Sequence, residues 1–170
     1  MANQGKLIIA GIGIKLISHL THEVKLAIES ADDIFYLSYH PLMDKFLKSL
    51  NPNANSLNYF YSESDDRISV YRNIRDLLVN AVKEGKNVCM VFYGHPCVFA
   101  MPGRMAIEEL KKDGYSCQAL PGISAMACIF SDLLIDPAFG CASFEASDLI
   151  LSKKKLILLS ITLFGSHTCS

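Results

Sequence analysis

The sequence has no tryptophan, no pair of cysteines with CxxC spacing and no excess of positive charge. A net charge of -1 lacks the basic footprint of nucleic-acid-binding proteins, so we expect no nucleic-acid partner. The six cysteines are scattered, and several lie in apolar runs, where cysteine is most often a small buried hydrophobe. We therefore expect reduced thiols and no metal or redox site built on cysteine.

Long apolar runs are also missing. The longest, LILLSITLF over residues 156–164, has about half the length that a membrane-spanning helix needs. No basic stretch precedes an apolar segment near residue 1, as a signal peptide would require. These features predict a cytoplasmic protein without a membrane partner.

What the sequence does contain is an alternation of apolar strand patterns and amphipathic helix patterns. Hydrophobic residues make up 51% of the 170 residues, which suits one domain with a packed core. The patterns predict strands over 6–14, 33–39, 56–61, 87–94, 115–122 and 141–150, and helices over 21–31, 41–50, 68–85, 105–114 and 124–135. Such alternation predicts an α/β fold with a mostly parallel sheet and helices on both faces.

In a parallel sheet, ligands bind at the carboxyl ends of the strands. That rule places three loops on one edge: Gly11–Lys15, Tyr93–Pro96 and Pro121–Ala125. The Gly11-x-Gly13 pair resembles half of a nucleotide-binding fingerprint, but such pairs are often simple strand-to-helix turns. The Pro-Gly-x-Ser-Ala segment either leaves backbone N–H groups for a ligand or is an ordinary capped helix.

Two further groups of polar residues have both a functional and a plain interpretation. Arg67 and Tyr71 are four apart and share a helix face, so the arginine can stabilise negative charge on phenols, or simply cover an aromatic ring. His19 and His22 are three apart, but no third ligand is spaced to join them, so no metal is expected.

Together, the segments IIAGIGI, FYGHPCVFAMPGRMAI, LPGISAMACIFSDLLIDP and GCASFEASDLI resemble the S-adenosylmethionine-dependent tetrapyrrole methylase superfamily in order and spacing. Within it, the sequence is most similar to the borosin-type peptide backbone α-N-methyltransferases, through the YGHP-x-VF, DLxIDP and SFEASD strings. The resemblance covers roughly residues 6–151. It implies an N-terminal methyltransferase domain over residues 1–151, a homodimer, and a fused or separate precursor peptide as partner.

The resemblance also implies roles for particular residues. Its catalytic set matches four positions here: Tyr61, Arg67, Tyr71 and Tyr93. Its S-adenosylmethionine site matches the three predicted loops, at Gly11, Gly13, Tyr93, Gly94, His95, Pro96, Val98, Pro121, Gly122, Ser124 and Ala125. A peptide N–H is a very weak acid, so its methylation needs a base and a group that holds the imidate-like oxygen. We expect Tyr61 or Tyr71 to be the base and Arg67 the electrostatic stabiliser.

Two features depart from the family pattern. Gly103 and Arg104 stand where the resemblance leads one to expect a serine–histidine type pair before a helix. Residues 152–170 do not match the start of the second α/β domain that follows in the family, and we interpret them as an atypical apolar tail. We consider three interpretations of this tail: a truncated or frameshifted second domain, a strand that closes the sheet or pairs with a second copy, and a fused substrate.

The sequence leaves two other functions open. One is methyl transfer to a tetrapyrrole or another small molecule, which does not call for a deprotonating tyrosine–arginine set. The other is a non-catalytic subunit that binds a precursor peptide or a longer homologue.

Overall fold

The computed structural model describes residues 4–37, 40–63, 66–98, 100–141 and 143–144. The chain divides into two compact units, Met1–Pro137 and Ala138–Ser170. The first unit contains every strand of the sheet and the three predicted rim loops. The short 3-10 helix η1 (Pro137–Phe139) lies at the boundary.

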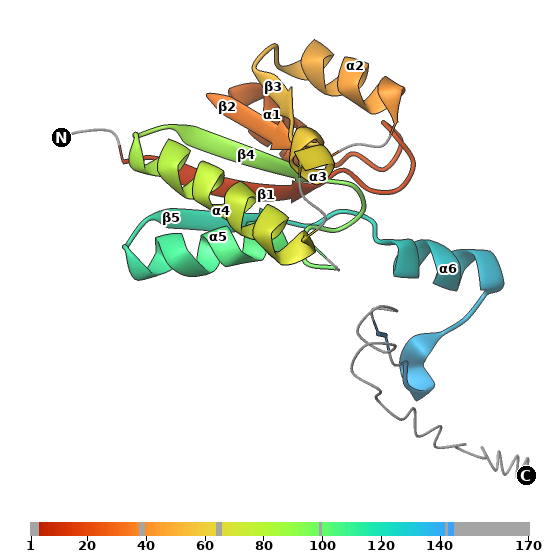
Figure 1. Ribbon diagram of the computed structural model, residues 1–170. Coiled ribbons are helices and arrows are strands. Elements are labelled where there is room, and N and C mark those ends of the chain that lie inside the picture. The colour runs from red at the N-terminus through yellow and green to blue at the C-terminus, as the bar shows by residue number, and fades with distance from the viewer. Residues whose placement is uncertain (1–3, 38–39, 64–65, 99, 142, 145–170) are drawn as a thin grey trace, which may run out of the picture. The chain divides into compact units, whose positions relative to one another are not determined.

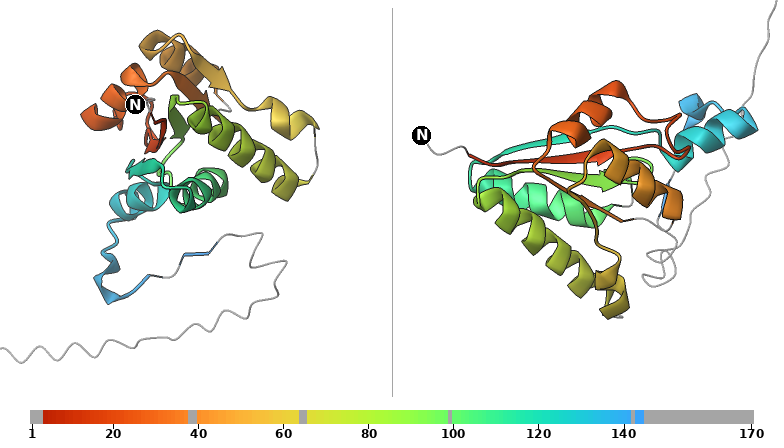
Figure 2. Two further views of the ribbon diagram at one scale, coloured as in Figure 1. Left: turned by 90° about the vertical axis from the view of Figure 1, so that its left-hand side faces the viewer. Right: turned by 90° about the horizontal axis from the view of Figure 1, so that it is seen from above.

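The first unit is built on a five-stranded, entirely parallel sheet with the strand order β3-β2-β4-β1-β5. Helices cover both of its faces, α1 and α2 on one and α4 and α5 on the other (Figures 1 and 2). This confirms the predicted α/β class. The strands are β1 (Lys6–Gly11), β2 (Asp33–Tyr36), β3 (Ala54–Ser56), β4 (Asn87–Phe92) and β5 (Ser116–Leu120); the helices are α1 (His22–Ser30), α2 (Pro41–Leu50), α3 (Tyr59–Glu63), α4 (Arg67–Lys83), α5 (Met101–Lys112) and α6 (Ala125–Leu133).

Alternate residues of each central strand enter different cores. In β4, Val88, Met90 and Phe92 pack under α4 and α5, whereas Cys89 and Val91 pack under α1 and α2. Because the strand is buried on both faces, its sequence is apolar throughout rather than alternating. Burial raises the pKa of the Cys89 thiol to about 12.

The local end signals of several helices agree with the sequence. Thr21 caps α1 through the Val24 N–H, and Pro41 occupies the first turn of α2. α4 ends before Gly85, which adopts a positive φ of 91°. Among the described residues no helix is both long and apolar enough to cross a membrane.

The strand predicted over 56–61 is wrong. The strand is β3, which shares only Ser56 with the predicted range, and Tyr59–Glu63 forms the short helix α3. The Leu57 N–H bonds to Tyr36 O, and the next two bonds close turns, from Phe60 N to Leu57 O and from Tyr61 N to Asn58 O. Packing of Phe60 and Tyr61 on the core therefore overrides their preference for strands.

Three other features of the structure differ from the expected pattern. Ile68, an apolar residue at the start of the helix predicted over 68–85, is 46% exposed, whereas Val70 is buried. α5 begins at Met101, so Gly103 and Arg104 lie inside the helix rather than before it. Of the described cysteines only Cys89 is buried, and Cys97 and Cys141 are exposed. The strand predicted over 141–150 and the tail over 152–170 lie almost wholly outside the described residues; Cys141, Ser143 and Phe144 are not in a strand.

Candidate active site

The strand order creates a crevice between the carboxyl ends of β2 and β4. From β2 the chain runs through α2, on one face of the sheet, to β3. From β4 it runs in the opposite direction, through α5 on the other face, to β5. Adjacent connections that diverge in this way mark the topological switch point of a parallel sheet, where ligands bind. The crevice lies beside the predicted rim.

The three predicted loops meet at that rim through backbone contacts. Gly13 and Gly94 exchange two hydrogen bonds, of 3.1 and 3.0 Å, between the loops after β1 and β4. A Cβ on Gly122 would lie 2.2 Å from Gly94 O and 2.5 Å from Gly11 O. We name Gly11, Gly13, Gly94 and Gly122 the glycine rim; close packing leaves no room for a side chain at Gly11, Gly13 and Gly122, and Gly94 has a positive φ of 74°.

The Tyr-Gly-His-Pro turn after β4 divides its tasks among its residues. Gly94 adopts a φ of 74°, and Pro96 packs against Gly11. His95 Nδ1 accepts the Cys97 N–H at 3.0 Å, and His95 O accepts the Val98 N–H at 3.1 Å. The histidine therefore holds the turn, and the turn presents Tyr93, which is 60% exposed.

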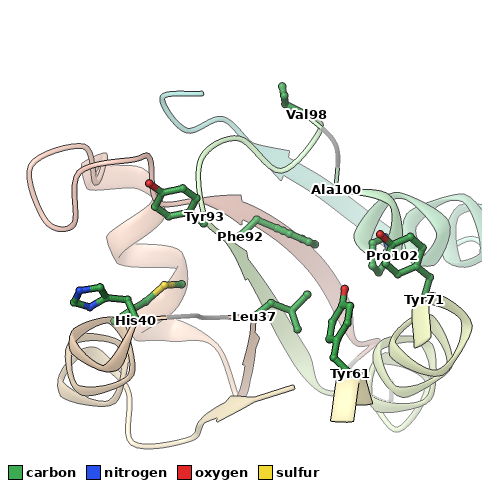
Figure 3. Close-up of a pocket in the computed structure, with 10 residues that line it drawn as sticks. Leu37, His40, Tyr61, Tyr71, Phe92, Tyr93, Val98, Ala100 and Pro102 are labelled. Carbon is green, nitrogen blue, oxygen red and sulfur yellow. The ribbon is translucent and has the colours of Figure 1, made fainter. Parts of the chain in front are cut away.

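A pocket of about 400 Å³ occupies the crevice (Figure 3). Tyr61 of α3, Tyr71 of α4 and Tyr93 after β4 line it, so three of the four predicted catalytic residues come together from three elements. Figure 3 shows Tyr61 and Tyr71 on one side and His40 and Tyr93 on the other. The remaining lining is apolar: Leu37, Met43, Phe92, Val98, Ala100 and Pro102.

Arg67 lies at the first position of α4, one turn before Tyr71, and does not line the pocket. The cap residue Asp66 fixes this helix end, since its carboxylate accepts the Ile68 and Ser69 N–H groups at 3.2 and 3.1 Å. The Ser69 hydroxyl, these two backbone N–H groups and more distant Arg72 lower the pKa of Asp66. The cap therefore stays ionised at neutral pH and fixes the start of the helix that carries Arg67 and Tyr71.

Most of the other residues predicted to bind S-adenosylmethionine lie on the rim rather than in the pocket. Ser124 caps α6 through the Ala127 N–H at 3.1 Å, and Ala125 begins that helix. Pro121 and Gly122 connect β5 to this cap. Of the residues predicted to bind S-adenosylmethionine, only Tyr93 and Val98 line the pocket.

The histidine pair near α1 has a role in loop structure. His19 Nδ1 accepts the N–H groups of Ile14 and Lys15, both at 3.2 Å, and its Cβ side packs against Gly13. Within the described ranges no group of three or more histidine, cysteine or acidic residues could hold a metal ion.

His40 is a pocket residue that the sequence reasoning missed. It caps α2, and its Nδ1 accepts the Leu42 N–H at 3.2 Å. A signal was present, because His40-Pro41 follows β2 just as His95-Pro96 follows β4. The apolar wall residues could not be singled out, since Leu37, Met43 and Phe92 resemble any core residue in sequence.

The residues of the crevice fit S-adenosylmethionine, the methyl donor that the sequence resemblance implies. A pocket of this volume falls within the range of small-molecule sites, which are mainly apolar with a few polar groups. Aromatic faces attract a cationic sulfonium, and three phenol rings line this pocket. The glycine rim beside it leaves backbone rather than side chains at the edge.

Comparison with known families decides the assignment. The model of the tetrapyrrole (corrin/porphyrin) methylases matches residues 6–157. The chain belongs to this family. The match includes all five strands and the whole of the crevice.

Several curated relatives of this methylase-family chain are fungal borosin proteins. A methyltransferase and type I borosin cyclic peptide precursor of Coprinopsis marcescibilis is 37% identical over 168 residues, covering 95% of this chain and 43% of the relative. The methyltransferase and omphalotin A precursor of Omphalotus olearius is 37% identical over 157 residues, covering 92% of this chain and 38% of the relative. The chain thus spans about two fifths of the length of these relatives.

Solved structures of other methyl-transfer and related proteins share the fold. The uroporphyrin-III-C-methyltransferase of Thermus thermophilus superposes with a TM-score of 0.60 at 21% identity, over 78% of this chain and 54% of that one. A diphthine synthase superposes with a TM-score of 0.57 at 16% identity, over 74% and 47%. At these identities the likeness concerns the fold alone.

Proposed function

We propose that this chain carries the catalytic residues of an S-adenosylmethionine-dependent methyltransferase that acts on backbone amide nitrogens of a ribosomally made precursor peptide. The observation that carries this proposal is the convergence of Tyr61, Tyr71 and Tyr93 on one pocket at the switch point. The borosin relatives, whose names join a methyltransferase to a cyclic peptide precursor, support the peptide as substrate.

The chemistry divides among the pocket residues. S-adenosylmethionine supplies, when bound, an electrophilic methyl group on a positively charged sulfur. The glycine rim and the Pro121–Ala125 loop would hold it at the edge of the sheet, and Tyr93, which precedes Gly94 and lines the pocket, would border both it and the peptide. The apolar walls exclude water, which strengthens electrostatic interactions inside the pocket.

The amide nitrogen must lose its proton before it can accept a methyl group. A phenolate oxygen of Tyr61 or Tyr71 takes that proton, and the negative charge moves to the amide oxygen as the C–N bond shortens. The guanidinium of Arg67, one helical turn from Tyr71, stabilises the phenolate and the developing oxyanion. Either tyrosine satisfies this scheme.

A second candidate is a subunit that binds a precursor peptide or a longer homologue without turnover. It is favoured by α6, which is apolar but has no buried residue. A homodimer is also part of the proposal, because a second copy would cover the same side chains.

The test begins with the donor. Isothermal titration of the full chain with S-adenosylhomocysteine is expected to show binding, and no heat up to millimolar ligand would contradict the donor site. Next, the chain, S-adenosylmethionine and a synthetic LILLSITLF peptide, which repeats residues 156–164, are incubated together. Fragmentation mass spectra should place each added methyl group on a backbone nitrogen. A methyl group on a side-chain atom would contradict the peptide-nitrogen assignment.

A further inference from the structure

Tyr36 lies behind the pocket and touches none of its space. It is the last residue of β2, it is fully buried, and it faces the core under α1 and α2. Its chain neighbour Leu37 lines the pocket from the opposite side of the strand. Neither the family resemblance nor the pocket lining assigns Tyr36 a role.

The side chain of Tyr36 ties the sheet to α2. Its hydroxyl donates a hydrogen bond to Asp44 Oδ1, and Lys48 Nζ lies 3.2 Å from Asp44 Oδ2. The C-terminal half of α2 has its own anchors: Leu47 is buried, Leu50 is partly buried, and the side-chain amide of the cap residue Asn51 donates to Ile28 O and Ala31 O at 3.0 and 2.9 Å. In the N-terminal half, the bond from Tyr36 to Asp44 acts together with the buried Met43 to fix the position of the helix.

That helix forms one wall of the pocket. Met43, next to Asp44, lines the pocket, and so does the cap residue His40. A shift of α2 along or about its axis would move both side chains relative to Tyr93. Figure 3 shows Tyr93 on the same side of the pocket as His40.

The main chain of Tyr36 fixes a second wall. Its carbonyl accepts the Leu57 N–H at 2.8 Å, and Leu57 is buried and starts the turn into α3. Two further bonds close this turn, from Phe60 N to Leu57 O at 3.2 Å and from Tyr61 N to Asn58 O at 3.1 Å, and the second orients the predicted catalytic tyrosine. Tyr36 is thus bonded both to α2 and to the turn into α3, and it directly precedes the pocket residue Leu37.

The charges make the tie to α2 a strong one. Burial, and then the bond to Asp44, raises the pKa of Tyr36, so its hydroxyl stays protonated and donates. The Tyr36 hydroxyl, and then Lys48, lowers the pKa of Asp44, which stays ionised. A neutral donor facing a carboxylate makes a charge-assisted hydrogen bond, stronger than a neutral pair.

We propose that Tyr36, acting through Asp44, is a positioning residue that sets the wall of the pocket formed by His40 and Met43. Its effect on turnover rests on the proposed function, whereas its effect on the pocket does not. Removal of the hydroxyl leaves the ring in the core and lets the N-terminal half of α2, which bears His40 and Met43, shift.

The test uses the full chain and four substitutions. Two substitutions break the hydrogen bond between Tyr36 and Asp44. Tyr36→Phe removes the donor in the core, and Asp44→Ala removes the acceptor on the half-exposed helix. If Tyr36→Phe fails to fold, Asp44→Ala carries the test. Two substitutions are controls. Lys48→Gln removes the ion pair with Asp44 but keeps the hydrogen bond from Tyr36. Tyr115→Phe removes a phenol just before β5, outside the pocket lining.

The first readout needs no substrate. Tyrosine labelled with ¹³C at Cζ gives one signal for each of the seven tyrosines. In the two broken variants, at a temperature where each is fully folded, we expect a shift of the Tyr61, Tyr71 or Tyr93 signal. Lys48→Gln and Tyr115→Phe should leave these three unchanged. A lower melting temperature with all three signals unmoved would show a merely structural role and overturn the proposal.

The second readout is turnover of the LILLSITLF peptide. We expect kcat to fall about 10- to 100-fold in both broken variants, because a small displacement of a reacting group is costly, while KM for the donor changes less than about twofold. Unchanged kcat in both would overturn the proposal. If the unsubstituted chain methylates no peptide, the proposed function fails, and the tyrosine signals alone decide the positioning role.

Discussion

At the residue scale, the pocket separates residues that touch a ligand from residues that hold them in place. Tyr61, Tyr71 and Tyr93 face the pocket, whereas His95, Asp66 and Tyr36 act through hydrogen bonds behind it. His95 shows the difference most clearly, because its Nδ1 is engaged by the Cys97 N–H. Its role as a donor-binding residue stays a prediction.

Arg67 provides the first prediction at this scale. Arg67→Ala should lower kcat for peptide methylation by about 100- to 1000-fold, the usual effect of removing one oxyanion-stabilising group, with donor affinity retained. The measurements are steady-state kinetics and titration with S-adenosylhomocysteine. Arg75→Ala, two turns further along α4 and paired with Asp76 and Glu109, is the matched control and should keep its rate. An equal rate for Arg67→Ala would remove the arginine from the mechanism.

Asp44 provides a second prediction, on pH. Its pKa lies below the ordinary value of 3.8 in the folded chain, so the ionised carboxylate stabilises the fold above that value. This contribution is lost as the pH falls through the lowered pKa. The stability difference between the unsubstituted chain and Asp44→Asn should therefore be constant above about pH 5 and shrink below it. Urea denaturation across this range measures it, and a difference independent of pH would contradict the assignment.

At the element scale, three strand-to-helix loops form the rim by packing backbone on backbone. The loops after β1, β4 and β5 approach so closely that Gly11 and Gly122 have no room for a side chain. α5 makes a similar approach, since a Cβ on Gly103 would lie 2.8 Å from the ring of Phe92, a pocket residue. Small residues thus set the distances between the elements that bear the site.

Gly122 tests this packing. Gly122→Ala places a methyl group 2.2 Å from a backbone oxygen, so the free energy of unfolding should fall by about 3 kcal/mol or more. Gly114→Ala is the control: it has φ of 80° and nothing within 4 Å, so backbone strain alone should cost about 1 kcal/mol. Chemical denaturation compares the two. Equal losses would show that the loops can move apart.

At the scale of the whole molecule, the surface of the first unit is uneven. α4 and α5 bury their apolar faces, whereas α6 leaves Ile129 and Leu133 exposed and Leu134, which follows it, 92% exposed. Exposed apolar clusters of this kind are typical of protein interfaces.

This surface predicts self-association. In sedimentation velocity at micromolar concentration, the chain should sediment as a species heavier than its monomer mass of 18.8 kDa. Ile129 and Leu133 are four apart on one helix face, so Ile129→Glu combined with Leu133→Glu should restore the monomer. Leu26→Glu, at another exposed apolar side chain on α1, should not. A single species of monomer mass for the unsubstituted chain would contradict the predicted dimer.

Much of the fold followed from local pattern. Apolar runs and caps such as Thr21 predicted most strands and helices, and the parallel arrangement put the three rim loops on one edge. The error at residues 56–61 has a tertiary cause, because the aromatic side chains of α3 are strand-prone in isolation and helical only against the core. Likewise, Met101 begins α5 earlier than the pattern predicted.

The sequence by itself determined the fold class and the family and predicted the tyrosine–arginine set, because periodicity and motif spacing are properties of the chain alone. Only the tertiary structure decided that β2 lies beside β4, since strand pairing depends on contacts between distant residues. That neighbourhood opens the crevice, brings His40 and Met43 to the tyrosines, and sets Tyr36 against Asp44 behind them. A buried hydroxyl needs a partner, and the chain finds this one eight residues away, on a helix whose position the core decides.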